Sequence, residues 1–243
     1  MAQVLRKVAA EFIGTAFLLV AIIGSGIAAQ NLSPSDTGLE LLENAVATGA
    51  ALVAIILAVG SLSGAHLNPV ISVADALFRG MRRGELAPYL AAQFGGAVVG
   101  AIIANLMFSQ PIVSVSTHIR GGPGLWLSEV LATFGLLMVV FGLTRTGRTS
   151  VAPFAVGAYI TGAYFFTSST SFANPAVTLA RTLSNTFAGI APVSVVPFVL
   201  AQIVGAALAC LTVRLLWPRA ADRAQTVVVP HGGDVGALEV TRA

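Results

Sequence analysis

Two Asn-Pro pairs stand at similar places in this chain, Asn68-Pro69 within SGAHLNPVISVAD and Asn174-Pro175 within SFANPAVTLAR. Asparagine is a preferred helix N-cap, and proline is favoured at the first helical position because its missing N–H is not needed there. Each pair therefore predicts the start of a short helix. The first N–H groups and the positive dipole end of such a helix donate hydrogen bonds to polar solutes and disfavour cations.

The composition places these helix starts in a membrane protein. Of 243 residues, 56% are hydrophobic and only 9% are charged, with a mean hydropathy of +0.88. An ordinary soluble domain has about 25% charged residues. The pI of about 9.6 does not indicate nucleic-acid binding, because the basic residues do not cluster into a binding face. A single cysteine, Cys210, excludes a disulfide or a cysteine metal site within one chain, and we expect no cofactor and no metal.

Six apolar segments are long enough to cross a bilayer, which takes about 20 helical residues. They lie at about 9–29, 41–61, 86–108, 125–144, 151–168 and 193–217. Two further segments, at about 69–78 and 175–185, follow the Asn-Pro pairs and are too short to cross, which is typical of re-entrant segments. We therefore predict an all-α membrane protein with six transmembrane helices and two re-entrant half-helices.

The two halves of the chain are similar in sequence. EFIGTAFLLVAIIG from residue 11 is similar to EVLATFGLLMVVFG from residue 129, and PYLAAQFGGAVVGA from residue 88 is similar to PFVLAQIVGAALAC from residue 197. With three spans in each half, the second copy crosses in the opposite sense, so we predict an inverted repeat with copies at about 8–108 and 125–217. Residues 1–217 would form one channel domain and 218–243 a flexible cytoplasmic tail.

The basic residues predict the orientation. If both termini are cytoplasmic, nearly all of them fall on the cytoplasmic side, whereas Arg120 falls outside with three acidic residues. The expected cytoplasmic set is Arg6, Lys7, Arg79, Arg82, Arg83, Arg145, Arg148, Arg214, Arg219, Arg223 and Arg242.

These motifs resemble those of the aquaporin, or major intrinsic protein, family over about residues 8–217. The resemblance implies six tilted helices, two half-helices that meet at NPA motifs, and a homotetramer with one pore in each subunit. The motif residues here are Asn68, Pro69 and Val70, and Asn174, Pro175 and Ala176. Val70 departs from the usual alanine, and we expect it to alter the spacing of the two motifs modestly.

The resemblance also assigns supporting residues. It implies that Glu11 and Glu129 hold the re-entrant loops by accepting their backbone N–H groups, with a proton relay as the alternative. It implies that His66 tethers its loop, with a pH gate as the alternative.

The outer constriction departs from the family pattern. Most members have an arginine directly after the second NPA triplet, whereas this chain has Val177 there and Arg181 four residues later. Arg181 either reaches the pore vestibule or caps the short helix, where a cation is favoured. The other constriction positions carried over are Thr48, Ser171 and Tyr164, with helix packing as the alternative for each. Tyr164 depends on a two-residue deletion before the motif; without it the position is Gly162.

A filter of threonine, serine and valine is wider and less charged than the aromatic and arginine ring of a water-only channel. We therefore predict a passive channel for water and small uncharged solutes, such as glycerol-like polyols and metalloid hydroxides. Some bacterial relatives with this departure are associated with arsenic resistance, so the resemblance makes arsenite a candidate solute and a bacterial inner membrane the expected location.

Two alternatives stay open. One is a water-selective channel. Another is a proton-coupled secondary transporter, which also uses inverted repeats and broken helices; the acidic residues well within spans are only Glu11 and Glu129, near the span starts. An intramembrane enzyme is disfavoured because His66 has no neighbouring metal-ligand partner and Ser171 has no evident base.

Overall fold

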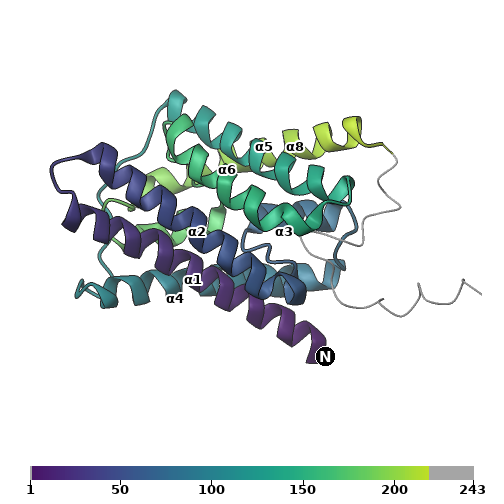
Figure 1. Cartoon of the computed structure of the whole chain (residues 1–243), viewed down its shortest axis with the longest axis horizontal. Helices are drawn as coiled ribbons and strands as arrows, with labels where there is room; N and C mark the ends of the chain where they lie inside the picture. The colour runs from purple at the N-terminus through teal and green to yellow at the C-terminus, as the bar shows by residue number, and fades with distance from the viewer. Residues whose placement is uncertain (1, 219–243) are drawn as a thin grey trace, which may run out of the picture.

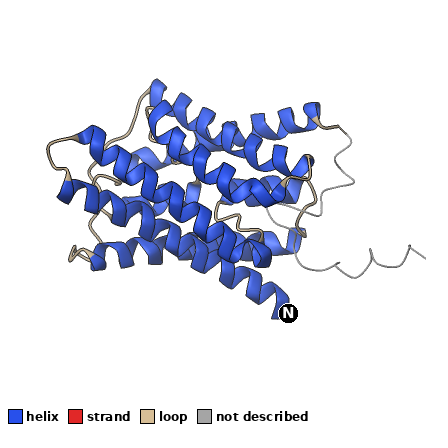
Figure 2. Ribbon diagram, in the orientation of Figure 1, coloured by secondary structure: helices blue, strands red, loops and turns tan. Residues whose placement is uncertain are grey.

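In the computed structural model, which describes residues 2–218, six long helices form a bundle around two short ones (Figure 1). The long helices are α1 (Ala2–Leu32), α2 (Thr37–Ser63), α4 (Arg83–Met107), α5 (Pro123–Arg145), α6 (Ala152–Phe166) and α8 (Val195–Leu216). The short helices are α3 (Pro69–Leu77) and α7 (Pro175–Ala180). Residues 2–218 contain no strand (Figure 2), and the predicted all-α fold class is confirmed. Residues 219–243 of the expected tail lie outside the described residues.

Five helices of the described part are long and apolar enough to cross a membrane, namely α1, α2, α4, α5 and the helix that begins at Pro192 and includes α8. The expected span at 151–168 corresponds to α6, which has 15 residues. At 1.5 Å per residue it is about 22 Å long, less than the hydrocarbon core of about 30 Å. It is shorter than expected because Thr167 is already extended and begins the second re-entrant loop.

Helices in corresponding positions of the two halves pack closely through glycine. A Cβ added at Gly96 of α4 would meet the carbonyl oxygen of Phe12, and one at Gly100 would meet that of Ala16, so α1 and α4 run parallel in close contact. In the other half, a Cβ at Gly205 of α8 would meet the backbone of α5. Small residues at such crossings let helix backbones approach within a bilayer.

The helix directions agree with an inverted repeat. α2 runs antiparallel to α1, since Asn44 bonds to Ile22 near one end and Val59 lies by Gly14 near the other. α6 runs antiparallel to α2, and α5 turns back into α6 through a short connection (Figure 1). α5 therefore runs opposite to α1, and the second half is inverted.

Basic residues meet at one end of the bundle. Lys7 forms an ion pair with Glu85 at 3.3 Å, which joins the starts of α1 and α4. The guanidinium groups of Arg145 and Arg214 lie 4.8 and 5.6 Å from the centroid of the Phe78 ring, which joins the ends of α3, α5 and α8. These contacts bring together members of the basic set that the sequence groups on one side.

Candidate functional site

Each Asn-Pro pair begins a half-helix with the geometry of an N-cap. Asn68 is extended, and its Oδ1 accepts the N–H of Val70 at 3.1 Å. Asn174 is also extended, and its Oδ1 accepts the N–H groups of Ala176 and Val177 at 3.0 and 3.2 Å. The prolines follow in the first helical turn, as Pro69 and Pro175.

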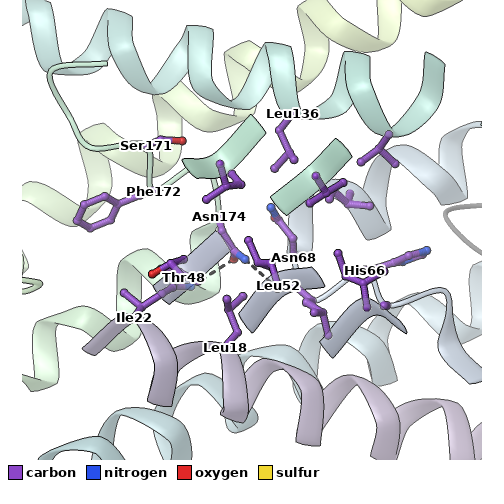
Figure 3. Close-up of a pocket in the computed structure, with 18 of the residues that line it drawn as sticks. Leu18, Ile22, Thr48, Leu52, His66, Asn68, Leu136, Ser171, Phe172 and Asn174 are labelled. Atoms are coloured by element: carbon purple, nitrogen blue, oxygen red, sulfur yellow. Dashed lines mark hydrogen bonds between the residues drawn. The ribbon is translucent and has the colours of Figure 1, made fainter. Parts of the chain in front are cut away.

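The two asparagines also join the halves of the molecule. The Nδ2 of Asn68 donates to the carbonyl of Ala173 at 2.8 Å, and the Nδ2 of Asn174 donates to the carbonyl of Leu67 at 2.8 Å. Figure 3 shows the two asparagines next to each other, with His66 on one side and Phe172 on the other. Because each amide bonds to the opposite loop, the positive ends of α3 and α7 converge on one point.

Both re-entrant loops place non-glycine residues in the left-handed region at the same positions, three residues and one residue before the asparagine. These are Ala65 and Leu67 (φ 47° and 52°) and Ser171 and Ala173 (φ 52° and 48°). This conformation costs energy for residues with a side chain and persists where the surroundings hold it. The matching pattern in both halves indicates that the loops are held by equivalent groups.

Glu11 holds the first loop. Its carboxylate accepts the backbone N–H groups of His66 and Leu67 at 2.9 and 2.7 Å, the hydroxyl of Ser63 at 2.7 Å and the amide of Gln93 at 2.8 Å. The carboxylate is fully buried, and hydrogen bonds to a charged acceptor are stronger than those between neutral groups.

Glu129 holds the second loop in the same way. It accepts the N–H groups of Phe172 and Ala173, both at 2.9 Å, and the amide of Gln202 at 2.7 Å. Gln93 and Gln202 also bond to hydroxyls in α3 and α7, Ser72 at 2.8 Å and Thr178 at 2.9 Å. The sequence pairs these glutamines in the repeat without assigning them this role.

His66 is buried in contact with α3. Its Nδ1 lies 3.0 Å from the hydroxyl of Ser72, and its Nε2 lies 3.6 Å from a carboxylate oxygen of Asp75. The ring also faces Tyr89, with the centroids 5.5 Å apart. These contacts tie the loop to the half-helix that follows it.

One cavity runs through the region where the halves meet. At one end it is lined by four residues that the sequence nominates for the constriction, Thr48, Tyr164, Ser171 and Val177, and also by Arg181. Asn68 and Asn174 line its middle, and His66 lines its other part (Figure 3). All other lining side chains except Phe172 are aliphatic: Leu18, Ile22, Leu52, Ile56, Ala65, Leu67, Ile71, Leu136, Val140, Val156 and Ile160. The polar groups thus lie along an otherwise apolar wall.

The two candidates on α6 lie differently with respect to the cavity. Tyr164 lines the cavity, whereas Gly162 points toward Phe166, since a Cβ there would lie 3.7 Å from that ring. Pro69, Val70, Pro175 and Ala176 are not among the lining residues of this cavity; they are buried in the first turns of α3 and α7.

Arg181 occupies the C-cap position of α7, and its side chain lines the cavity. It is 2% exposed, its Nε donates to the carbonyl of Ala188, and its guanidinium lies 3.5 Å from the centroid of the Phe172 ring. The guanidinium of Arg120 lies over the same ring at 5.2 Å. Burial lowers the pKa of Arg120 from its ordinary value, but arginine is charged across the physiological range. The sequence leaves a cap and a pore position as alternatives for Arg181; its guanidinium bonds to Ala188, outside α7, and its side chain lines the cavity.

The model of the family described as Major intrinsic protein matches residues 1–173 and 154–240. This chain belongs to the major intrinsic protein family. Among the family's members, it is 46% identical to the aquaglyceroporin AqpS of Rhizobium meliloti (strain 1021) over 211 residues, which cover 87% of this chain and 90% of the relative.

Two further relatives extend the comparison. The chain is 30% identical to the glycerol uptake facilitator protein of Streptococcus pneumoniae (strain ATCC BAA-255 / R6), over 63% of this chain and 70% of that protein. The X-ray structure of the aquaglyceroporin from Plasmodium falciparum has a TM-score of 0.67 at 20% identity, covering 89% of this chain and 98% of that one. This structural likeness shows that the fold is shared.

Proposed function

We propose that this chain is a passive channel that conducts water and small neutral solutes such as glycerol. The observation that carries the proposal is the constriction, in which Val177 stands where most of the family has an arginine. Valine offers neither hydrogen-bond donors nor charge at this point, and the wall nearby is formed by Thr48, Ser171 and Tyr164. The similarity to an aquaglyceroporin and to a glycerol uptake facilitator supports the same class of solute.

Neutral metalloid hydroxides belong to the same proposal. Arsenite is uncharged near neutral pH and presents hydroxyl groups, as glycerol does. An apolar wall with isolated donors and acceptors suits such a solute, because polar groups fix its orientation while the aliphatic side chains set the width.

A water-selective channel is the second candidate, and the observation that favours it is the Tyr164 ring. Its hydroxyl bonds to Thr48, so the aromatic ring is held against the cavity wall and occupies part of the constriction. A proton-coupled transporter is less well supported, because the hydrogen bonds of Glu11 and Glu129 to the re-entrant loops account for their burial.

We further propose that both termini are cytoplasmic in a bacterial inner membrane, with the end that contains Lys7, Arg145 and Arg214 facing the cytoplasm. The excess of basic residues supports this orientation. A homotetramer is the assembly that we propose from membership of the family.

The decisive experiment is stopped-flow light scattering of proteoliposomes that contain the purified protein, with water, glycerol and arsenite as solutes. We expect wild type to pass all three. Val177→Arg should retain water flux and lose most of the glycerol and arsenite flux, because it restores a bulky fixed cation to the constriction. Wild-type liposomes that pass only water would establish the water-selective alternative.

A further inference from the structure

Arg181 has two unused donor groups at the Val177 end of the cavity. Its Nε bonds to the carbonyl of Ala188, and the side-chain hydrogen bonds of the described part include none from its two Nη groups. The side chain is nevertheless only 2% exposed and lines the cavity. The guanidinium is therefore held by one hydrogen bond and by stacking on Phe172. Its two Nη groups can donate hydrogen bonds to a solute in the cavity.

A second unused donor, the hydroxyl of Ser171, lines the same cavity. Ser171 is 4% exposed, and its hydroxyl has no hydrogen-bond partner among the described residues. It directly precedes Phe172, the ring on which Arg181 stacks (Figure 3). A buried polar group without a partner costs free energy that a bound ligand can recover.

Positive charge exceeds negative charge at this mouth, because Arg120 and Arg181 share one nearby carboxylate, that of Glu129. Arg120 also lies over Phe172, and its Nε and Nη2 donate to the carbonyls of Gly189 and Phe187 at 2.8 and 3.0 Å. Within residues 2–218 the ion pairs join Lys7 and Arg82 to Glu85, and His66 lies 3.6 Å from Asp75, so none of these contacts involves Arg120 or Arg181. Neither guanidinium forms an ion pair within the described residues, and two of them face the single Glu129 carboxylate, so a net positive potential remains that attracts anions.

We propose that Arg181, together with the Ser171 hydroxyl, forms a binding site for small oxyanions at this mouth of the pore. The planar donor groups of an arginine match two oxygen atoms of a carboxylate or phosphonate. Arg120 contributes its positive charge, while its Nε and Nη2 stay bonded to backbone carbonyls. Arg181 places a cation one helical turn beyond Val177, while the position of Val177 itself stays uncharged. The inference rests on the proposed function only in taking the cavity as the path of water.

Methylphosphonate is a suitable probe, because its charge keeps it from crossing lipid. It is placed at equal concentration on both sides of the proteoliposomes, with potassium chloride at matched ionic strength as the reference, and water flux is measured by osmotic shrinkage. We expect wild-type water flux to fall roughly twofold or more at saturating probe, as is reasonable for a charge-assisted bidentate contact in the path. Arg181→Met should abolish the inhibition, and Arg181→Lys should weaken it.

Arg145→Met is the matched control. Arg145 also stacks on a phenylalanine at the other end of the bundle, does not line the cavity, and should leave the inhibition unchanged. Equal inhibition of wild type and Arg181→Met, or no inhibition of wild type, would overturn the proposal.

A second measurement covers the case in which Arg181→Met does not fold. Purified wild-type protein in detergent should broaden the phosphorus NMR signal of methylphosphonate, and Ser171→Ala should reduce the broadening; a signal without broadening would overturn the site. The outcome is separable from the proposed function. If methylphosphonate inhibits wild type but wild type passes no glycerol, the anion site is supported and the proposed glycerol channel is refuted. If wild type passes glycerol but is not inhibited, the glycerol channel is supported and the anion site is refuted.

Discussion

The hydroxyl of Tyr164 on α6 donates to Oγ1 of Thr48 on α2 at 3.2 Å, and both side chains are almost completely buried against the cavity. The bond satisfies two polar groups in an apolar wall and fixes the position of the tyrosine ring. Because Val177 contributes little bulk, we expect this ring to set the width of the constriction.

Tyr164→Ala removes the ring and should raise glycerol flux relative to water flux. An increase of up to about tenfold corresponds to about 1.4 kcal/mol in the barrier. Tyr164→Phe keeps the ring and loses only the bond to Thr48, so its flux ratio should stay close to wild type. The two ratios are measured in proteoliposomes at equal protein density. Identical ratios in wild type and Tyr164→Ala would show that the constriction lies elsewhere.

Glu11→Gln tests the support of the first re-entrant loop. The carboxylate accepts four hydrogen bonds, and an amide replaces one acceptor oxygen by a donor that faces N–H groups. We expect a loss of about 2–5 kcal/mol in the free energy of unfolding, since buried donors lose their partners. Thermal unfolding in detergent measures this loss, and all solutes should lose flux in proportion.

Glu43→Gln provides the comparison for that variant. Glu43 is half-buried and accepts a single bond, from the hydroxyl of Ser33 at 2.9 Å. Its substitution should cost less than about 1 kcal/mol. Similar losses in the two variants would contradict the support role of Glu11.

Much of this architecture is predictable because its signals are local. Asn68 and Asn174 cap their half-helices through bonds to residues two or three positions later, so the preference is encoded within a few residues. Helix spans follow from the length of apolar segments, and the inverted sense follows from three spans in each half.

The rest depends on contacts between distant parts of the chain. Nothing local predicts left-handed backbone at Ala65 or Ser171, because such residues disfavour it and the conformation is imposed by the loop contacts. The choice between Tyr164 and Gly162 depends on the direction of a side chain on α6. The position of the Arg181 side chain at the cavity depends on two contacts outside α7. The guanidinium stacks on the Phe172 ring, and its Nε donates to the carbonyl of Ala188.

Gly96→Ala tests the close contact of α1 and α4. The added Cβ would meet the carbonyl oxygen of Phe12, so the two backbones must separate. We expect a loss of about 1–3 kcal/mol or more, measured by thermal unfolding in detergent. Gly84→Ala, in the first turn of the same helix, has no atom within 4 Å of the added Cβ and should be neutral or stabilising by up to about 1 kcal/mol. A destabilised Gly84→Ala together with an unaffected Gly96→Ala would refute this packing.

Asn68→Asp tests the role of the converging helix ends. The aspartate keeps the N-cap acceptor for Val70, but it loses the amide that donates to the Ala173 carbonyl at 2.8 Å. It also places a negative charge at the point where two positive helix ends meet, which offsets the field that disfavours cations there. We therefore expect cations to pass where wild type excludes them, with water flux reduced by less than the cation leak is raised. A pH-sensitive dye inside proteoliposomes, under an imposed potassium diffusion potential, measures proton entry.

Asn105→Asp is a suitable control, because Asn105 bonds to the carbonyls of Ile112 and Leu183 and does not line the cavity. A proton leak of the same size in both variants would show that damaged packing causes the leak. No leak in Asn68→Asp would show that the exclusion of cations does not depend on the charge at the two asparagines.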